Sequence, residues 1–313
     1  MTQTIQNVSD TAFMVAGFRA LENEQPKRLF HDPLAAKLVG DHGKEILATI
    51  PRHFVGAWSV VIRSVIIDDY IRQAVAAGVD TILNLGAGLD TRPYRIELPS
   101  SLRWIEGDFL HMIELKETRL ADEKPGCRLE RIKLDLTDRA LRRRLFSNVN
   151  ARAGKILVLT EGVIPYLTNE DVAELADDLR QAKKIGFWIT DYFSPEAIRY
   201  GEKMRARFMR NAPFRFNPKD WFSLRRARLA GFRDSLHRGG SEPARPSHSA
   251  AVLRAGVDRP QNAVRLARAP GQDEEICRLR APGPGVTASS SGRFEQDDEI
   301  SGLRRMRRKS GVA

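Results

Sequence analysis

Five short apolar runs recur between residues 79 and 193, and amphipathic segments separate them. The runs cover residues 79–85, 102–105, 129–136, 156–159 and 187–193. Each is bounded by glycine, proline or charged residues, which is typical of buried strands. Residues 169–182 have apolar positions at helical spacing, and Thr168 or Asn169 is suited to cap that helix. Because such alternation builds a mostly parallel sheet with helices on both faces, the sequence predicts a doubly wound α/β fold.

The segment that precedes the first run predicts helices. Residues 55–71 place apolar side chains at helical spacing, and Asp32-Pro33 is a favourable helix start because proline is preferred at the first helical position. We therefore expect an N-terminal helical cap over residues 1–76 and an α/β core over residues 77–222. Residues 195–211 predict a further, basic helix.

Residues 223–313 differ from the rest of the chain in composition. From residue 225 onward there are 18 basic and 10 acidic residues, 17 of the basic ones are arginine, and the aromatics are Phe232 and Phe294. Such a segment cannot bury enough apolar area to offset roughly 1–2 kcal/mol of backbone entropy per ordered residue, so a disordered tail is predicted. A nucleic-acid-binding arm is the less favoured alternative, because the aromatics that stack on bases are scarce.

Cysteine usage and hydropathy point to a compartment. Cys127 and Cys277 are too few for a disulfide framework or a cysteine-based zinc site, and they suit a reducing cytosol. The N-terminus lacks the basic start and apolar core of a signal peptide, and no run approaches the roughly 20 apolar residues of a membrane-spanning helix. We expect a cytoplasmic protein that binds neither a metal nor a membrane.

A glycine motif follows the first predicted strand. Gly86 and Gly88 form a Gly-x-Gly turn, which lets backbone approach a ligand closely, and the helix that we expect next would offer free N–H groups to a polar or anionic group. The third glycine of a dinucleotide fingerprint would stand at position 91, where the chain has Thr91. A tight structural turn therefore remains an alternative to a binding loop.

Acidic residues end the next three predicted strands. Glu106 and Asp108 follow the glycines by about 20 residues, where a carboxylate accepts hydrogen bonds from ribose hydroxyls. Asp135 and Glu161 end the third and fourth strands. Because the carboxyl ends of parallel strands face one crevice, these side chains are expected to converge there.

Taken together, these motifs resemble a known family. GAGLDTRPYR at residues 86–95, the Glu-x-Asp of 106–108, the Asp-Leu of 135–136 and TEGVIPYL at 160–167 are similar to the leucine carboxyl methyltransferase family, above all its bacterial branch with polyketide O-methyltransferases. The likeness covers about residues 9–222. It implies a class I methyltransferase, with a Rossmann-like doubly wound sheet and S-adenosylmethionine as cofactor.

The resemblance also implies roles for individual residues. Backbone of the glycine turn would approach the cofactor, Asp108 would bind ribose, an Asp-Leu pair would meet adenine, and Arg63 and Glu161 would lie at the methionine part. The predicted cofactor-binding residues are Arg63, Gly86, Ala87, Gly88, Asp108, Asp135, Leu136 and Glu161. Arg19 is a weaker candidate, whereas Asp90 and Arg92 are expected to pin the loop.

Two departures from the family pattern stand out. Gly107 takes the place of an apolar residue in the second strand's Glu-x-Asp. The two strands that normally complete the sheet are not recognisable in residues 223–313, so we expect them to be missing or scrambled. A shift of reading frame after about residue 223–233 would explain the change to an arginine-rich sequence.

The expected activity is O-methylation of a small molecule, at a carboxylate or a hydroxyl. No histidine lies in the strand-end motifs, and His111 is predicted on a helix surface, so no catalytic residue is assigned. This favours an acceptor such as a carboxylic acid, which is ionised at neutral pH and needs no general base. Tyr94, Tyr166 and Tyr192 are candidates to line its pocket. Polyketides, small acids and protein C-termini all stay open as acceptors, and the alternatives are an NAD(P)-dependent oxidoreductase and an inactive, truncated or frameshifted methyltransferase.

Overall fold

The computed structural model describes residues 5–50, 55–193, 198–199, 206 and 208–217, together with the backbone of two short strands further on. The helices are α1 (Val8–Asn23), α2 (Pro33–Thr49), α3 (Val55–Ala76), α4 (Arg92–Arg95), α5 (Leu110–Arg119), α6 (Arg139–Arg152), the 3-10 helix η1 (Ile164–Tyr166) and α7 (Asn169–Gln181). The strands are β1 (Thr81–Leu85), β2 (Arg103–Asp108), β3 (Arg128–Lys133), β4 (Ile156–Thr160), β5 (Ile185–Tyr192), β6 (Arg233–Asp234) and β7 (Ala263–Arg268).

The strands form one seven-stranded sheet in the order β3-β2-β1-β4-β5-β7-β6. Strands β1 to β5 are parallel to their neighbours, and β7 runs antiparallel to β5 and β6. The strand order reverses between β1 and β4, since β2 and β3 lie on one side of β1 and β4 and β5 on the other. Ligands of open α/β sheets bind at such a switch point, beyond the carboxyl ends of the strands.

All five predicted runs are strands, with ends displaced by at most three residues. The predicted helix at 169–182 is confirmed as α7, whose N-cap Thr168 exchanges hydrogen bonds with Asp171 in a capping box. Asp32 caps α2 and Pro33 opens it, as the sequence indicates. The basic helix predicted over 195–211 lies largely outside the described residues.

Strands β6 and β7 differ from the expectation that the sheet lacks its final strands. Residues Phe187 to Tyr192 of β5 pair with Arg268 to Ala263 of β7, and β7 in turn pairs with β6. The sheet therefore continues past β5, through residues that the composition of the tail did not identify as strands. The remainder of the predicted tail at 223–313, and with it the proposed change of frame, lies outside the described residues.

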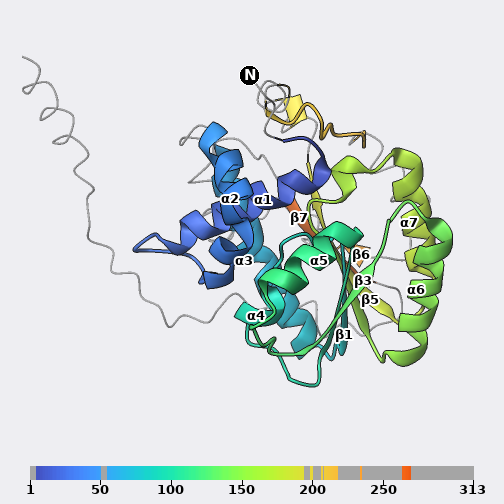
Figure 1. Ribbon diagram of the computed structural model, residues 1–313. Helices are drawn as coiled ribbons and strands as arrows, with labels where there is room; N and C mark the ends of the chain where they lie inside the picture. Colours follow the sequence, from blue (N-terminus) through green and yellow to red (C-terminus); the bar gives the residue numbers. More distant parts are fainter. Residues whose placement is uncertain are drawn as a thin grey trace, which may run out of the picture. The chain divides into compact units, whose positions relative to one another are not determined.

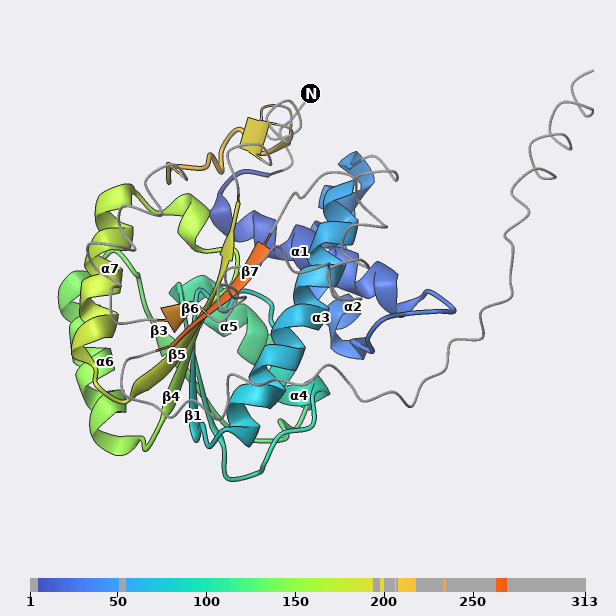
Figure 2. The same ribbon diagram turned by 180° about the vertical axis from the view of Figure 1, so that it is seen from behind.

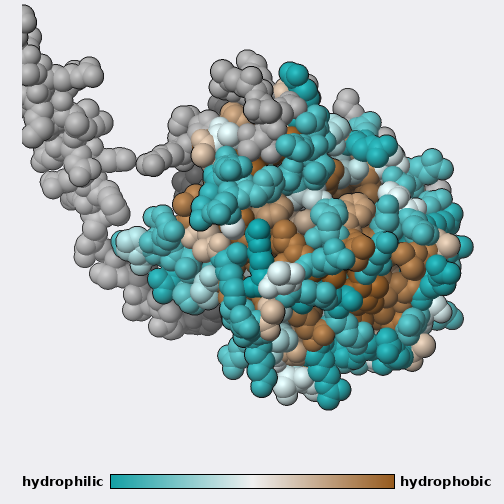
Figure 3. Space-filling view, in the orientation of Figure 1, coloured by the Kyte–Doolittle hydropathy of each residue, from teal (hydrophilic) through white to brown (hydrophobic). Residues whose placement is uncertain are grey.

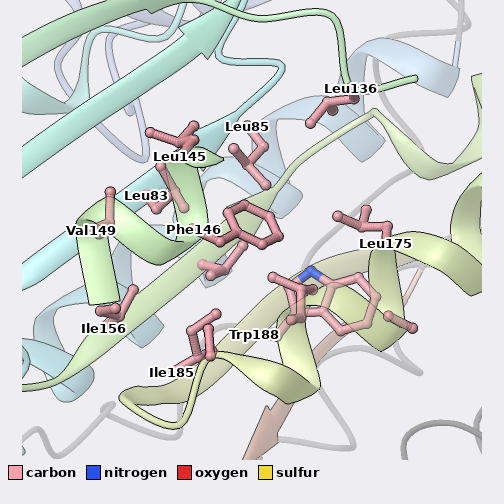
Figure 4. Close-up of a cluster of buried hydrophobic side chains, with 14 of the residues drawn as sticks. Leu83, Leu85, Leu136, Leu145, Phe146, Val149, Ile156, Leu175, Ile185 and Trp188 are labelled. Atoms are coloured by element: carbon pink, nitrogen blue, oxygen red, sulfur yellow. The ribbon is translucent and has the colours of Figure 1, made fainter. Parts of the chain in front are cut away.

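Alternating side chains of the strands build two apolar layers. Leu83 and Val158 point to the layer beneath α6 and α7, whereas Ile82 and Leu157 point to the layer beneath α3. This follows from the two-residue period of a strand, and it explains why β4, which is buried on both faces, has a continuous apolar run. Figure 4 shows Phe146 of α6 among the leucines of β1 in the first layer.

A third layer joins the N-terminal helices. Helix α1 packs on α2 and on α3, around a core that includes Phe13, Leu38, Val60 and Met112 of α5. Figures 1 and 2 show α6 and α7 on one side of the sheet and α3 on the other. Helix α1 lies near the carboxyl ends of the strands.

Polar and charged residues cover most of the face drawn in Figure 3, and apolar residues reach the surface between them. Such a mixed surface is ordinary for a folded protein. Among the helices that the structure describes, none combines the length and apolar character needed to cross a bilayer.

Candidate functional site

A cavity of about 720 Å³ opens at the carboxyl ends of β1 to β4. The loops after these strands form its floor, and residues of α1, α3 and the segment 208–215 complete its lining. All eight predicted cofactor residues line it: Arg63, Gly86, Ala87, Gly88, Asp108, Asp135, Leu136 and Glu161. Its volume falls in the range of roughly 300–1,000 Å³ that is usual for small-molecule sites.

The glycine turn passes close to its neighbours on both sides. Gly86 and Gly88 have φ of +67° and +47°, a backbone region that favours glycine. The N–H groups of Gly86 and Ala87 donate to the carbonyl of Gly107, 2.8 and 3.3 Å away. A Cβ atom on Gly86 would lie 2.5 Å from Val163 Cγ2. The turn therefore leaves no room for a side chain on Gly86.

The helix expected after this turn is reduced to the single turn α4. The Arg92 N–H donates to Asp90 Oδ1 at 3.0 Å, so it is already used within the loop. The prediction of a helix N-terminus with free donors is wrong in this detail. Polar contacts in this part of the cavity come instead from the backbone of the turn and from the side chains at the strand ends.

Asp108 is fixed by the backbone around it. Its Oδ2 accepts the N–H of Gly88 at 2.6 Å and its Oδ1 accepts the N–H of Phe109 at 2.7 Å. Burial raises the pKa of the carboxyl group, against the opposing effect of these two hydrogen bonds. Each carboxylate oxygen keeps a second lone pair, which can accept a hydroxyl from the cavity.

Asp135 and Leu136 follow β3 at the opposite side of the turn. Asp135 is exposed, and its Oδ1 accepts the N–H of Thr137 at 2.9 Å and the Thr137 hydroxyl at 2.7 Å. Leu136 is buried beside it. The pair offers an apolar surface next to a carboxylate, which is the combination expected around a purine ring.

Arg63 and Glu161 face each other across the strand ends. Arg63 Nε donates to Glu161 Oε1 at 2.8 Å, and Arg63 Nη1 donates to Asp191 Oδ2 at 2.9 Å. Burial acts to raise the pKa of Glu161, but the charges of Arg92 and Arg63 outweigh it and lower that pKa. Within the described residues, the Nη2 group of Arg63 has no hydrogen-bond partner, so one donor remains for an anion in the cavity.

Arg92 connects the glycine loop to α3 and to Glu161, which follows β4. Its Nη1 donates to Asp90 Oδ2 at 2.9 Å and to Glu161 Oε2 at 2.7 Å, and its Nε donates to Asp68 Oδ1 at 2.6 Å. The side chain is 1% exposed. Burial disfavours the charged guanidinium, but Asp90 and Glu161 raise its pKa well above the usual value. Arg92 thus holds three carboxylates in fixed positions.

Comparison with known proteins shows which family the chain belongs to. A model described as leucine carboxyl methyltransferase matches residues 12–180, more than half of the 313 residues. A curated relative from Mycolicibacterium smegmatis is 31% identical over 209 residues, which are 60% of this chain and 68% of the relative. The chain belongs to the leucine carboxyl methyltransferase family. The resemblance seen in the glycine and strand-end motifs is confirmed.

The relatives' names class them as S-adenosyl-L-methionine-dependent methyltransferases. One from Streptomyces avermitilis is 36% identical over 130 residues, which are 39% of this chain and 46% of the relative. The chain therefore matches about half the length of this relative and of those from Streptomyces coelicolor and Frankia alni. These findings favour neither the oxidoreductase nor the inactive alternative.

Solved structures agree on the fold. A DUF574 family protein from Streptomyces avermitilis has a TM-score of 0.51 at 15% identity, covering 82% of this chain and 97% of that protein. A protein from Thermobifida fusca that is described as a methyltransferase has a TM-score of 0.51 at 14% identity, covering 86% and 96%. At these identities the likeness shows the fold alone, which is the predicted methyltransferase α/β fold.

Several contacts of this family member were not foreseen from its sequence. Asp68 of α3 and Asp191 of β5 bind the arginines that support the cavity, although only Asp90 and Arg92 were expected to pin the loop. Asp68 directly follows the apolar residues 65–67 and Asp191 stands in a mostly apolar strand, and a carboxylate buried in such a place indicates a cation nearby. Arg19, the weaker cofactor candidate, lines the cavity but pairs with Asp32 at 3.1 Å.

The remaining candidates divide between core and cavity. Tyr166 lines the cavity, whereas the Tyr94 hydroxyl accepts Arg131 Nη2 at 2.7 Å outside it. The side chain of Tyr192 lies outside the described residues. Glu106 is completely buried and paired with Lys116 and Arg131, so it supports β2 rather than the cavity. His111 is exposed on α5, as predicted.

An aromatic group lines the far part of the cavity. The ring of Phe214 lies 5.4 Å from those of Tyr166 and Phe193, at interplanar angles of 83° and 60°. Phe208 and Met209 join them in the lining. These side chains come from η1, from the end of β5 and from the segment 208–217, and they form an apolar region beside the polar strand ends.

Proposed function

We propose that this chain is a cytoplasmic S-adenosylmethionine-dependent O-methyltransferase. It acts on a carboxylate or hydroxyl of a small molecule such as a polyketide or carboxylic acid, and not on a membrane or nucleic acid. The observation that carries the proposal is the convergence of eight residues from α3 and four strand ends on one cavity of suitable volume. Membership of the family supplies the cofactor class.

The residues present fit this cofactor. The two glycines of the turn bring backbone to the cavity without side chains. Hydrogen bonds from two backbone N–H groups orient the Asp108 carboxylate, so its remaining lone pairs have fixed directions. Asp108 would hold the ribose hydroxyls, and Asp135 with Leu136 the adenine. The free Nη2 of Arg63 would bind the carboxylate of the methionine part, with Glu161 beside it. In this arrangement the ribose and the methionine carboxylate would contact side chains held in place by hydrogen bonds, and the adenine ring would lie on Leu136.

The bound cofactor supplies a methyl group on a sulfonium, which an in-line displacement transfers to a nucleophile. The protein mainly has to hold that nucleophile at about 3–3.5 Å from the methyl carbon. Among the described lining residues there is no histidine, and Asp90, Asp108 and Glu161 are each engaged by hydrogen bonds or arginines. A carboxylate acceptor, already ionised at neutral pH, needs no further base.

Calorimetric titration of the full chain with S-adenosylmethionine and S-adenosylhomocysteine tests the cofactor assignment. Micromolar binding is expected, with a loss of about 100-fold or more in Asp108→Asn, because two charged hydrogen bonds are weakened. Asp69→Asn is the matched control, since Asp69 is an exposed acid that bonds to Gln73 away from the cavity. Absence of binding by a folded chain would refute the proposal.

The product identifies the acceptor atom. Radiolabelled S-adenosylmethionine is supplied with panels of carboxylic acids, phenols and amines. A methyl ester releases labelled methanol in mild alkali, whereas a methyl ether or an N-methyl product does not. Label transfer only to nitrogen or carbon would contradict O-methylation while leaving the cofactor assignment intact.

A further inference from the structure

The segment 208–217 is anchored on η1 at the rim of the cavity. The N–H groups of Arg215 and Phe216 both donate to the carbonyl of Pro165, at 2.7 and 3.2 Å. The N–H of Asn217 donates to Asn169 Oδ1 at 2.8 Å, and Phe216 is buried in the core beneath α7. Backbone bonds and one buried ring therefore fix the position from which the Arg215 side chain projects.

Arg215 differs from the other arginines of the cavity lining. Arg19 and Arg63 are buried and pair with Asp32, Glu161 and Asp191. The Arg215 side chain is exposed, lines the cavity, and has neither an ion pair nor a side-chain hydrogen bond with any residue that the structure describes. It is thus a cation whose charge is available to a ligand.

The surroundings of Arg215 indicate what kind of ligand this is. Its neighbour Phe214 packs edge-on against Tyr166 and lies beside Phe193, so an apolar region that suits flat rings adjoins the charge. Among the described acids of the lining, Asp108 and Asp135 form no ion pair with a described residue, so they would repel an anionic ligand unless a cation offsets them. An arginine fork matches a carboxylate geometrically better than other side chains do.

We infer that Arg215 is a specificity-determining residue that selects an amphipathic acid as acceptor. The apolar or aromatic body of this acceptor lies against Phe214 and Tyr166, and its carboxylate pairs with the guanidinium of Arg215. This rests on the proposed function, because it names the class of acceptor for the same cavity. It adds that neutral molecules of the same shape are poor ligands.

The test compares two probes of equal shape, 2-naphthoate and 2-naphthamide. Each is titrated by calorimetry into the full chain saturated with S-adenosylhomocysteine. The wild type should bind the naphthoate about tenfold tighter, since a hydrogen bond to a charged group is stronger than one to a neutral amide. Arg215→Ala should bind both probes equally, with unchanged affinity for the amide, and Arg215→Lys should keep part of the preference.

Arg210→Ala is the matched control, because Arg210 is an exposed arginine of the same segment that does not line the cavity. It should keep the full preference. A preference that survives in Arg215→Ala, or that is absent from the wild type with cofactor product bound, overturns the inference. If S-adenosylhomocysteine itself does not bind, the proposed function fails instead, so the two failures are distinguishable.

Discussion

The two parts of the cavity are built in different ways. Apart from Arg63 of α3, the cofactor part consists of residues at or directly after the ends of β1 to β4, so the parallel sheet by itself brings them together. The acceptor part combines α1, η1 and residues 208–215, which lie far apart along the chain. Short local motifs therefore specify the first part, whereas the second exists only once the whole domain has packed.

The two parts also depend on different forces. Beneath the cofactor part, Arg63 and Arg92 bind the buried carboxylates of Asp68, Asp90 and Asp191 and the partly buried carboxylate of Glu161 after β4. The acceptor part relies on ring packing around Phe214. Substitutions in the ion network should consequently cost more stability than substitutions among the rings, and they should reach the cofactor first.

The largest effect is expected for Arg92→Ala. It removes the partner of Asp68, Asp90 and Glu161 at a site that is 1% exposed, so unfolding free energy should fall by about 3–5 kcal/mol. Lys37→Ala is the control, because its pair with Glu123 is 39% and 33% exposed and should contribute less than about 1 kcal/mol. Urea unfolding monitored by circular dichroism measures both, and equal losses would show that the network does not support the fold.

A smaller loss is expected when the glycine turn receives a methyl group. Gly86→Ala meets a strained φ and a contact of 2.5 Å with Val163, so a loss of about 2–4 kcal/mol and weaker S-adenosylhomocysteine binding should follow. Gly78→Ala is matched to it, since φ is +87° there but nothing lies within 4 Å of the added carbon. That control should lose about 1–2 kcal/mol from backbone strain alone and keep its cofactor affinity. Denaturant unfolding and calorimetric titration of both variants distinguish these outcomes. Loss of S-adenosylhomocysteine binding in Gly78→Ala as well as in Gly86→Ala would contradict the steric explanation.

The predictable features share a local physical cause. The five strands follow from short apolar runs, and α2 and α7 from their capping residues Asp32 and Thr168, because those signals act within one element. The cofactor residues at the strand ends could be chosen since strand ends of a parallel sheet must converge, whereas Arg63 of α3 was chosen from the resemblance to the family. Asp191 could not be assigned its partner, because Arg63 is 128 residues away and only packing brings the two together.

Strands β6 and β7 escaped prediction for another reason. β7 is six residues long, has arginine at its third and sixth positions, and stands in an arginine-rich segment. β6 has two residues, which is too short for any periodicity to register. Pairing with β5 supplies the hydrogen bonds that order such a strand, and a pattern search within the segment cannot detect that partner.

The decline of unfolding free energy at acid pH should depend on the cofactor part, through Glu161, and not on the acceptor part. Glu161 has a lowered pKa in the folded protein, where burial opposes but Arg92 and Arg63 prevail. Its stabilising contribution is therefore complete above the unfolded value of 4.5 and is lost as pH falls through the lower folded value. Glu161→Gln should be less stable at neutral pH and show a flatter decline of unfolding free energy below pH 4.5. Denaturant unfolding across this range measures the slope, and an unchanged slope would mean that Glu161 is not held by these arginines.

The smallest effect on the cofactor is expected from Phe214→Leu in the acceptor part. Loss of two edge-to-face ring contacts should cost about 1–2 kcal/mol of stability and weaken naphthamide binding several-fold, because those rings shape the apolar region. Affinity for S-adenosylhomocysteine should stay within about twofold, since the residues at the ends of β1 to β4 and the ion network are unchanged. Asp108→Asn should do the reverse and weaken cofactor binding first. Calorimetry on both variants with both ligands completes this comparison, and a parallel loss of both affinities in Phe214→Leu would show that the cavity acts as one unit rather than as two parts.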